Sequence, residues 1–486
     1  IPEFYSNSEI FITGGSGFIG RVLIEKLLRS CPDVKKIYIL LRNKRGKNIY
    51  DRLESFLDVP LFKVLKTINP DYQDKLVPIA GDVSKLRLGI SDGDIELMKN
   101  VSIIFHAAAS VRFDDPLKEA ILMNTRGTHE VIKFALNLKH LKVLLHTSTV
   151  FSNPLIFDVS EKIYPAPCDW RMAIKMAEMY DPELLNALSD KITNFYPNTY
   201  TFTKNLTEQI CNDYRDKLSI VVYRPSIITS SEIEPIAGWV DNFNGPFGVF
   251  AGVSIGLIRT GNFSWDKLIS TAPVDACVKG MIVSVWYENV SEKSSQTPLT
   301  IYNCAVDAQN SFTNQELINE GRKCYPEMPF TNVLWYPDGI KSYGNFHFYI
   351  LNFFLHIVPA ILFDSILKIS RKKPFLVKTY RRIFNSFMSL QYFTTNEWNF
   401  QLDNYRSLEN RLGETDRSSF CMKFPQTSKT EYFRNGTLGF RRYMFKEDDS
   451  TIPAAKRKYK RLFVIDLILK GIFVLLIVCI LFKRLY

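Results

Sequence analysis

The chain has 486 residues, more than one hydrophobic core usually serves, so we expect either two domains or one domain with an appendage. Hydrophobic residues make up 46% of the chain, and this composition excludes a disordered protein. The formal net charge is +11, but the sequence has no zinc-finger spacing, no helix-turn-helix pattern and no basic stripe with interleaved aromatic residues, so we expect no nucleic-acid partner. Basic clusters stand beside apolar runs at 371–373 and 456–461, which favours a membrane surface and phosphate-bearing small molecules.

Cysteine and histidine usage gives no sign of a metal site. The eight cysteines form no C-x-x-C pair, and the six histidines have no ligand partner at a suitable spacing. We therefore predict reduced, structural thiols in a protein that faces the cytosol, and no metal.

Residues 10–230 alternate short apolar runs with helical patterns, which is typical of an α/β protein with a doubly wound parallel sheet. The runs are 10–13, 36–41, 77–80, 103–107, 143–146 and 219–223. Segments such as 18–30, 124–138 and 198–214 carry apolar residues at intervals of three and four and are predicted helices.

The first run leads into a glycine-rich turn, Gly14-x-x-Gly17-x-x-Gly20, that opens the first helix. One glycine makes the tight turn, one lets the backbone approach a pyrophosphate, and the last permits close packing of helix on strand. A strand before and a helix after this pattern indicate a Rossmann dinucleotide site. The residues expected to bind the cofactor here are Thr13, Gly14, Ser16, Gly17, Phe18, Ile19 and Gly20.

The second run ends in cations where a site selective for NAD usually offers an acid. These cations are Arg42, Lys44 and Arg45. They favour the 2′-phosphate of NADP(H), although a solvated basic loop is the alternative. Asp82 follows the third run and suits the adenine edge, while Ala107 and Ala108 follow the fourth and are small enough for the backbone to approach the cofactor.

Tyr200 and Lys204 are four residues apart in a predicted helix between the fifth and sixth runs, so they share one helical face. An ammonium group there can lower the pKa of the phenol from about 10 and hold the nicotinamide ribose. A hydroxyl partner is expected where the fifth run ends. Ser148 and Thr149 both qualify, and the sequence does not separate them.

The sequence also predicts how the chain divides into domains. We assign 1–337 to the NADP(H)-binding domain, with a substrate subdomain interwoven at about 232–310. From residue 338 the composition becomes rich in Phe, Tyr and Arg, and 338–450 is predicted to be a helical C-terminal domain.

Two apolar stretches raise the question of membrane contact. The stretch 346–363 has polar interruptions and a proline, so we expect an interfacial or core helix rather than a span. The stretch 462–482 carries only Asp466 and Lys470 as charges and fits a transmembrane anchor in which Lys470 snorkels; a buried amphipathic helix is the alternative. The basic cluster before it places the large domain in the cytosol.

These motifs together resemble an extended short-chain dehydrogenase/reductase. The similar segments are 13–20, 106–109, 148–149, 200–204 and 223–226. More narrowly, the chain resembles the insect-type fatty acyl-CoA reductases over nearly its full length, with IPEFY at 1–5, CPD at 31–33 and GWVDN at 238–242. The sequence departs from that family at Gly15-Ser16, at Thr147 and at Val150-Phe151. The resemblance implies that Arg224 and Pro225 also lie at the cofactor site.

The resemblance further implies the reaction. A long-chain fatty acyl-CoA would be reduced by NADPH, CoA would leave, and the aldehyde would take a second hydride to give a primary alcohol. Tyr200 would donate to the developing alkoxide, Lys204 would support it, and Ser148 or Thr149 would add a second donor. Membrane lipid would be a partner, in the endoplasmic reticulum or the peroxisome, and the sequence leaves a homo-oligomer open.

Two alternatives share the same cofactor residues. One is a membrane-bound reductase of the hydroxysteroid type, which does not need the helical region beyond residue 338 and typically prefers NAD. The other is a non-catalytic membrane tether that senses a nucleotide, which would not need Tyr200 and Lys204.

Overall fold

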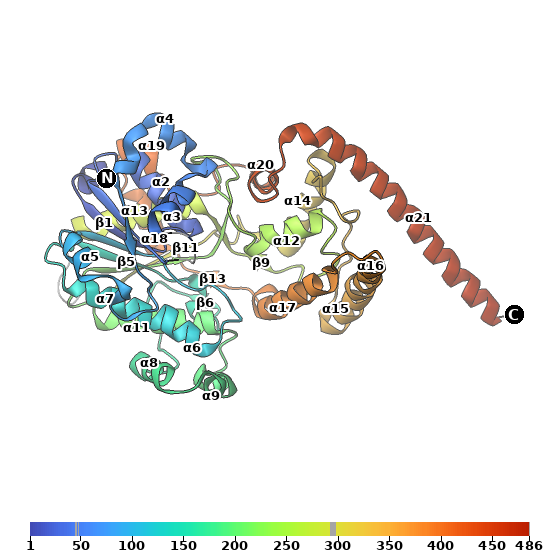
Figure 1. Ribbon diagram of the computed structural model, residues 1–486, viewed down its shortest axis with the longest axis horizontal. Coiled ribbons are helices and arrows are strands. Elements are labelled where there is room, and N and C mark those ends of the chain that lie inside the picture. The colour runs from blue at the N-terminus through green and yellow to red at the C-terminus, as the bar shows by residue number, and fades with distance from the viewer. Residues whose placement is uncertain (44–45, 47, 292–297, 486) are drawn as a thin grey trace. The chain divides into compact units, whose positions relative to one another are not determined.

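The computed structural model describes residues 1–43, 46, 48–291 and 298–485, and it divides into two compact units. Unit 1 comprises 1–236, 270–311 and 398–426, and unit 2 comprises 237–269, 312–397 and 427–486 (Figure 1). Lys44 and Arg45, two of the expected cofactor residues, lie outside the described residues.

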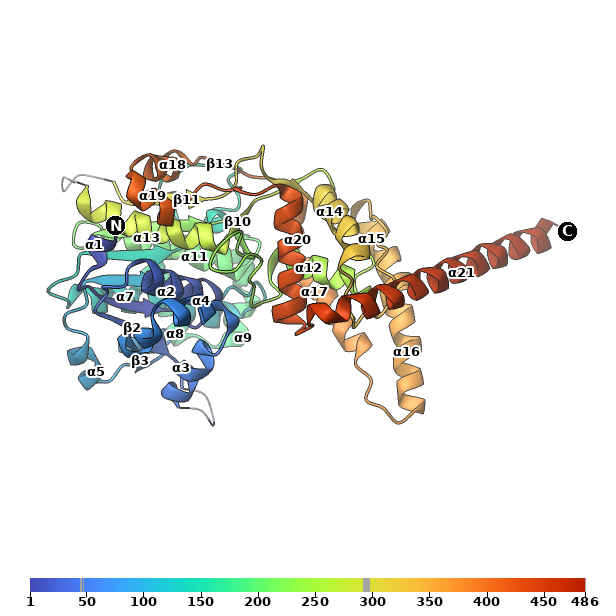
Figure 2. The same ribbon diagram turned by 90° about the horizontal axis from the view of Figure 1, so that it is seen from above.

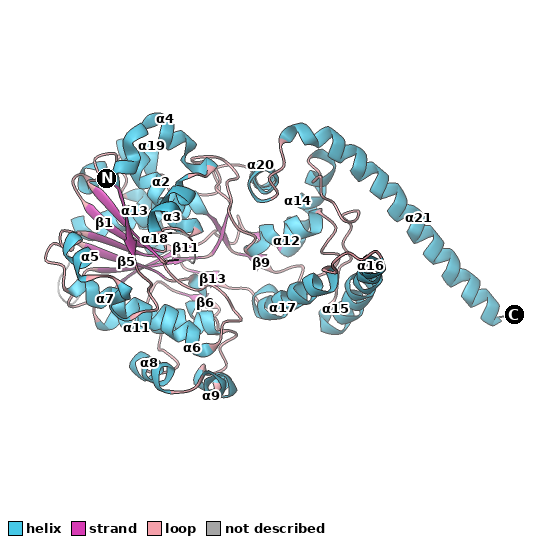
Figure 3. Ribbon diagram, viewed as in Figure 1, coloured by secondary structure: helices cyan, strands magenta, loops and turns pink. Residues whose placement is uncertain are grey.

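Unit 1 is built on a parallel sheet of seven strands, shown in magenta in Figure 3. In spatial order these are β11 (Thr300–Cys304), β7 (Ile220–Pro225), β5 (Val143–Thr147), β4 (Ile103–His106), β1 (Glu9–Thr13), β2 (Lys36–Leu41) and β3 (Leu76–Ala80). All six predicted runs become strands of this sheet. The order reverses between β1 and β4, so the carboxyl ends of these two strands flank the switch point at which such sheets bind nucleotides.

Helices cover both faces of this sheet. Those of unit 1 are α1 (Pro2–Tyr5), α2 (Phe18–Ser30), α3 (Ile49–Leu57), α4 (Lys63–Ile68), α5 (Asp92–Leu97), α6 (Leu117–Ala120), the π-helical η4 (Ile121–Arg126), α7 (Gly127–Leu136), α8 (Trp170–Met179), α9 (Pro182–Ala187), α10 (Ser189–Ile192), α11 (Thr199–Asp213), α13 (Val274–Val290), α18 (Asp403–Asn410) and α19 (Glu414–Phe420). Helices α2 and α13 contact each other on one face, and α7 and α11 lie on the other. Short strands add β6 (Asp158–Val159), β8 (Ile227–Thr229), β10 (Thr271–Pro273) and β13 (Asn399–Phe400).

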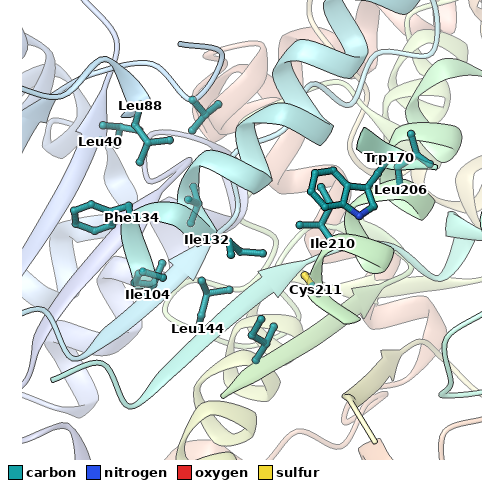
Figure 4. Packing of buried hydrophobic residues seen from close by; sticks show 14 of the residues in the cluster. Leu40, Leu88, Ile104, Ile132, Phe134, Leu144, Trp170, Leu206, Ile210 and Cys211 are labelled. Carbon is teal, nitrogen blue, oxygen red and sulfur yellow. The ribbon is translucent and has the colours of Figure 1, made fainter. Parts of the chain in front are cut away.

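One large hydrophobic core lies between the sheet and the helices of the second face. Figure 4 shows Ile104 and Leu144 of the strands packed against Ile132 of α7 and Ile210 of α11, all of them buried. Because α11 carries Tyr200 and Lys204, this core fixes that helix against the strand ends.

The division into units differs from the boundaries expected from the sequence. Residues 398–426, expected in the C-terminal domain, belong to unit 1, where β13 pairs in parallel with β6 and α18 packs on β11. Conversely, 237–269 and 312–337 belong to unit 2. Pairing between distant segments decides this, and no local pattern in the sequence reports it.

Unit 2 is mainly helical. It contains α12 (Gly245–Ser254), α14 (Asn314–Glu327), α15 (Gly344–Asn352), the π-helical η6 (Phe353–Ile357), α16 (Val358–Ile369), α17 (Leu376–Thr395), α20 (Lys429–Gly439), the π-helical η7 (Phe440–Met444) and α21 (Ile452–Leu485), with β9 (Leu268–Ile269) antiparallel to β12 (Phe312–Thr313). Its aromatic core joins α12 to α20 and α14, because Phe250 lies 4.5 Å from Phe433 and 5.4 Å from Tyr325 between ring centroids.

The stretch expected to be interfacial or core is part of one continuous helix, Gly344–Ile369. It is long and apolar enough to cross a membrane, and only 22% of its most apolar window is buried. The core-helix part of that expectation is therefore wrong. The helix gives weak support for membrane association.

Candidate active site

The glycine turn has the geometry that a dinucleotide requires. Gly14 adopts φ = +74°, and a Cβ there would lie 2.6 Å from the carbonyl carbon of Ala107 and from the nitrogen of Ala108. Helix α2 then begins at Phe18 with Gly17 as N-cap, which has no side chain to accept hydrogen bonds from the first turn. Its backbone N–H groups and the helix dipole suit a pyrophosphate.

The ends of β1 and β4 are tied together beside this turn. The Thr13 hydroxyl lies 2.7 Å from Nδ1 of His106 and accepts the Ala108 N–H at 3.3 Å. Burial lowers the pKa of His106 to about 3, so the imidazole is neutral. The structure thus brings Thr13, Gly14, Ala107 and Ala108 to one edge of the sheet, with Ser16, Ile19 and Gly20 in the same turn and helix start.

Two expected cofactor residues follow neighbouring strands. Arg42 comes directly after β2 and is exposed. Asp82 follows β3, and its Oδ1 accepts hydrogen bonds from the Ser84 N–H at 2.9 Å and the Ser84 hydroxyl at 2.8 Å. These contacts fix one side of the Asp82 carboxylate.

Tyr200, Thr149 and Lys204 meet at the end of β5. The Tyr200 phenol is hydrogen-bonded to the Thr149 hydroxyl, and burial raises the pKa of Tyr200 to about 12, although the Thr149 bond opposes the rise. Lys204 donates from Nζ to the Thr147 carbonyl at 2.6 Å. Burial lowers the pKa of Lys204 to about 8, although Glu208 opposes the fall. The expectation that Lys204 lowers the phenol's pKa is wrong here, because loss of solvation dominates.

Ser148 faces a different partner from Thr149. Its hydroxyl donates to Oε1 of Glu208 at 2.6 Å, while Oε2 of Glu208 pairs with Arg224 at 2.6 Å. Arg224 also donates to the carbonyls of Ser160 and Lys162. Its side chain is completely buried in these contacts, so the geometry does not match the expected cofactor contact. Pro225 offers its carbonyl to Thr149 at 3.3 Å.

Sequence reasoning missed two residues that hold this site. Glu208 lies one turn after Lys204 on α11, so extending the four-residue spacing from Tyr200 and Lys204 could have found it. Asn124, in the π-helical turn η4, accepts the Ser110 N–H at 2.8 Å and donates to the Thr203 hydroxyl at 2.9 Å, which ties the loop after β4 to α11. A polar residue in a helical pattern gave no signal of this role.

In the part of the chain that the structure describes, no group of three His, Cys, Asp or Glu residues could hold a metal ion.

Comparison with known proteins identifies the family. A family model described as male sterility protein matches residues 12–281, and a second model with the same description matches 355–447. Fatty acyl-CoA reductase wat of Drosophila melanogaster is 37% identical over 463 residues, which cover 95% of this chain and 89% of that protein. The chain belongs to the fatty acyl-CoA reductase family. Fatty acyl-CoA reductase 1 of Rattus norvegicus is 34% identical over 466 residues, with the same coverage of 95% and 89%.

Solved structures agree with the NAD(P)-binding reductase fold of this family. The terminal R domain of the myxalamid PKS-NRPS pathway aligns with a TM-score of 0.59 at 16% identity, covering 90% of this chain and 92% of that domain. The reductase domain of a nonribosomal peptide synthetase from Mycobacterium tuberculosis gives the same TM-score of 0.59 at 17% identity, with the same coverage of 90% and 92%. At these identities the likeness concerns the fold alone.

Proposed function

We propose that this reductase converts a long-chain fatty acyl-CoA into a primary alcohol with NADPH, through a bound aldehyde and with release of CoA. The observation that carries the proposal is the hydrogen-bonded pair of Tyr200 and Thr149 beside Lys204, in a chain of this family. Family membership disfavours a hydroxysteroid-type reductase. The Tyr200, Thr149 and Lys204 group disfavours a non-catalytic tether.

The fit of a dinucleotide rests on the glycine turn. Any side chain at Gly14 would occupy the space beside Ala107 and Ala108, and the uncapped start of α2 suits a pyrophosphate. Exposed Arg42 follows β2, where it suits the 2′-phosphate that distinguishes NADPH from NADH. The bound nicotinamide would supply the hydride for each of the two reductions.

The protein's own groups supply the proton and the orientation. With a pKa of about 12, Tyr200 is protonated at neutral pH and acts as a donor to the carbonyl oxygen of the thioester and then of the aldehyde. Thr149 orients that phenol and is the second donor, which favours Thr149 over Ser148 as the catalytic hydroxyl. Lys204 is largely protonated below its pKa of about 8 and favours the developing negative charge.

Membrane attachment by α21 is part of the proposal. This helix has 34 residues, and the two charges of the predicted anchor are paired within unit 2. Asp466 accepts the Trp335 indole N–H at 2.7 Å, and Lys470 pairs with Asp338 at 2.6 Å and with Asp466 at 2.7 Å. Lys470 is thus engaged by carboxylates rather than placed to snorkel. The catalytic unit would face the cytosol, at the endoplasmic reticulum or the peroxisome.

Product analysis tests the reaction. Membranes that contain the full chain, incubated with palmitoyl-CoA and NADPH, are expected to form hexadecanol, and NADH is expected to support far less. Tyr200→Phe should abolish alcohol formation but leave NADPH binding intact, whereas Tyr196→Phe, a matched control on the loop before α11, should remain active. Absence of alcohol from a protein that binds NADPH would refute the proposed reaction, and an active Tyr200→Phe variant would refute the assigned proton donor.

A further inference from the structure

Helix Gly344–Ile369 presents two opposite faces. Its buried face repeats every four residues, at Phe348, Asn352, His356, Ala360 and Asp364. The polar members of this face are satisfied within unit 2, because Nε2 of His356 accepts the Arg259 N–H at 2.9 Å and Nδ1 of His356 lies 2.8 Å from the Asn352 side chain. This face therefore docks the helix on its own unit.

The other face of the helix is apolar and exposed. Phe346 is 79% exposed, Phe354 63%, Leu362 62% and Ile369 84%. An apolar patch that extends along one helix is far larger than the scattered apolar residues found on ordinary protein surfaces. We therefore expect an apolar partner to cover this face.

The chain then turns and comes back along the same helix as α17, as Figure 2 shows. Asp364, in the middle of α16, accepts the N–H groups of Phe375, Leu376 and Val377 at the start of α17, at 2.9 to 3.0 Å. Phe348, near the start of the apolar helix, packs on Phe387 with ring centroids 6.0 Å apart. The two helices form an antiparallel hairpin, defined here as 344–395.

The returning half of the hairpin is strongly basic. Residues 365–396 contain no Asp or Glu. Their cations are all exposed: Lys368, Arg371, Lys372, Lys373, Lys378, Arg381 and Arg382. An exposed apolar face bordered by unneutralised cations is complementary to a bilayer surface with anionic headgroups.

We propose that the 344–395 hairpin lies in the plane of an anionic membrane leaflet, with its apolar face among the acyl chains and its cations at the headgroups. A transmembrane course is disfavoured because α17 would have to return through the hydrocarbon with Lys378, Arg381 and Arg382. This contact is separate from the anchor α21 and from the proposed reaction. It would hold unit 2 against the surface in which long-chain acyl groups reside.

Site-directed spin labelling of the full chain in vesicles tests the inference without substrate or cofactor. The parent carries Cys479→Ser, because Cys479 is exposed whereas the other cysteines are buried or half-buried. Labels at Phe354→Cys and Ile366→Cys report the apolar face, and Met179→Cys, in unit 1, is the aqueous control. Depth is measured from the relative access of oxygen and a water-soluble nickel chelate.

In phosphatidylcholine vesicles with phosphatidylserine, both hairpin labels are expected to lie in the acyl region at similar depth, while the Met179→Cys label stays in water. Labels in water at both positions would overturn the proposal. Depths that differ by about 18 Å, the rise of twelve helical residues, would show a span instead. Equal immersion without phosphatidylserine would overturn the role of anionic lipid.

Charge reversal tests whether the basic residues 371–373, rather than the overall charge of the protein, attach the hairpin to the membrane. Each basic residue near an anionic surface changes the docking equilibrium about five-fold, so Arg371→Glu with Lys372→Glu and Lys373→Glu should reduce docking by about 100-fold or more. A control that reverses three exposed lysines of unit 1 should dock normally. These are Lys139, Lys175 and Lys191. Circular dichroism verifies that both variants are folded, and equal docking of the two would refute the specific role of the turn.

Discussion

Replacing Glu208 by Gln should lower the free energy of unfolding and lower the pKa of Lys204 further. Glu208 is 1% exposed, and its carboxylate receives Nε of Arg224 at 2.8 Å and Nη2 at 2.6 Å. Breaking a buried ion pair by removing one partner costs about 3–5 kcal/mol. Arg224 keeps its bonds to the carbonyls of Ser160 and Lys162, so we expect a loss of about 3 kcal/mol, at the lower end of that range.

The same substitution should change the pH dependence of catalysis. Burial lowers the pKa of Lys204 to about 8, and the negative charge of Glu208 opposes that fall. Without this charge the pKa of Lys204 falls further, so the ammonium is lost at lower pH. The alkaline limb of kcat/KM should therefore move to lower pH in Glu208→Gln.

Stability should follow the same linkage. The folded pKa of Lys204, about 8, lies below the ordinary value of 10.5, so between these values the unfolded chain binds more protons. The cost of burying this ammonium is fully present below about pH 8 and is relieved as the pH rises toward 10.5. In Glu208→Gln this window begins at a lower pH, so the variant should regain part of its lost stability on mild alkalinisation.

Two assays and one matched control variant test the predicted changes in stability and in the pKa of Lys204. Denaturant unfolding between pH 7 and pH 10 gives the free energy of unfolding. NADPH oxidation with palmitoyl-CoA, measured at steps of about one pH unit, gives the pH profile of kcat/KM. Glu25→Gln is the control, because Glu25 is also buried and pairs with Arg29 at 2.7 Å but is not among the groups that shift Lys204. A profile that does not move, or moves alike in both variants, would refute the effect on Lys204.

Four further substitutions test the site. Thr149→Val should lower kcat about 100-fold and leave NADPH binding unchanged. Ser148→Ala should keep kcat but lose about 1–3 kcal/mol of stability, because the Glu208 carboxylate loses a hydrogen-bond donor. The reverse pattern would exchange the roles of the two hydroxyls. Gly14→Ala should weaken NADPH binding at least about 10-fold by calorimetry and cost more than about 1–2 kcal/mol of stability, given φ = +74°, and unchanged affinity would contradict the turn's assigned role. Arg42→Ala should raise the Kd for NADPH about 10-fold but leave that for NADH unchanged, and equal effects on both would remove the 2′-phosphate contact.

Local sequence patterns predicted much of the fold. The six apolar runs predicted strands that all appear in the sheet. The glycine turn needs only a strand before it and a helix after it, because the positive φ of Gly14 arises within the turn itself. Tyr200 and Lys204 could be paired because residues four apart share a helical face in any fold.

The folded structure, and not the sequence, shows which of Ser148 and Thr149 meets Tyr200. Both hydroxyls contact α11, but Tyr200 and Glu208 lie about two turns apart on that helix, and the sequence does not say which of the two each hydroxyl meets. Packing of α11 on the sheet directs Thr149 toward Tyr200 and Ser148 toward Glu208. The same packing buries Arg224, which its strand position alone did not reveal.

Local sequence patterns were enough to predict the strands, the glycine turn and the four-residue spacing of Tyr200 and Lys204, because each follows from residues close together in the chain. The folded structure was needed to show that 398–426 belongs to unit 1, that Thr149 meets the Tyr200 phenol, and that burial raises the pKa of Tyr200. Those features depend on segments far apart in the chain and on the water they exclude together, and a periodicity or spacing motif carries no record of either.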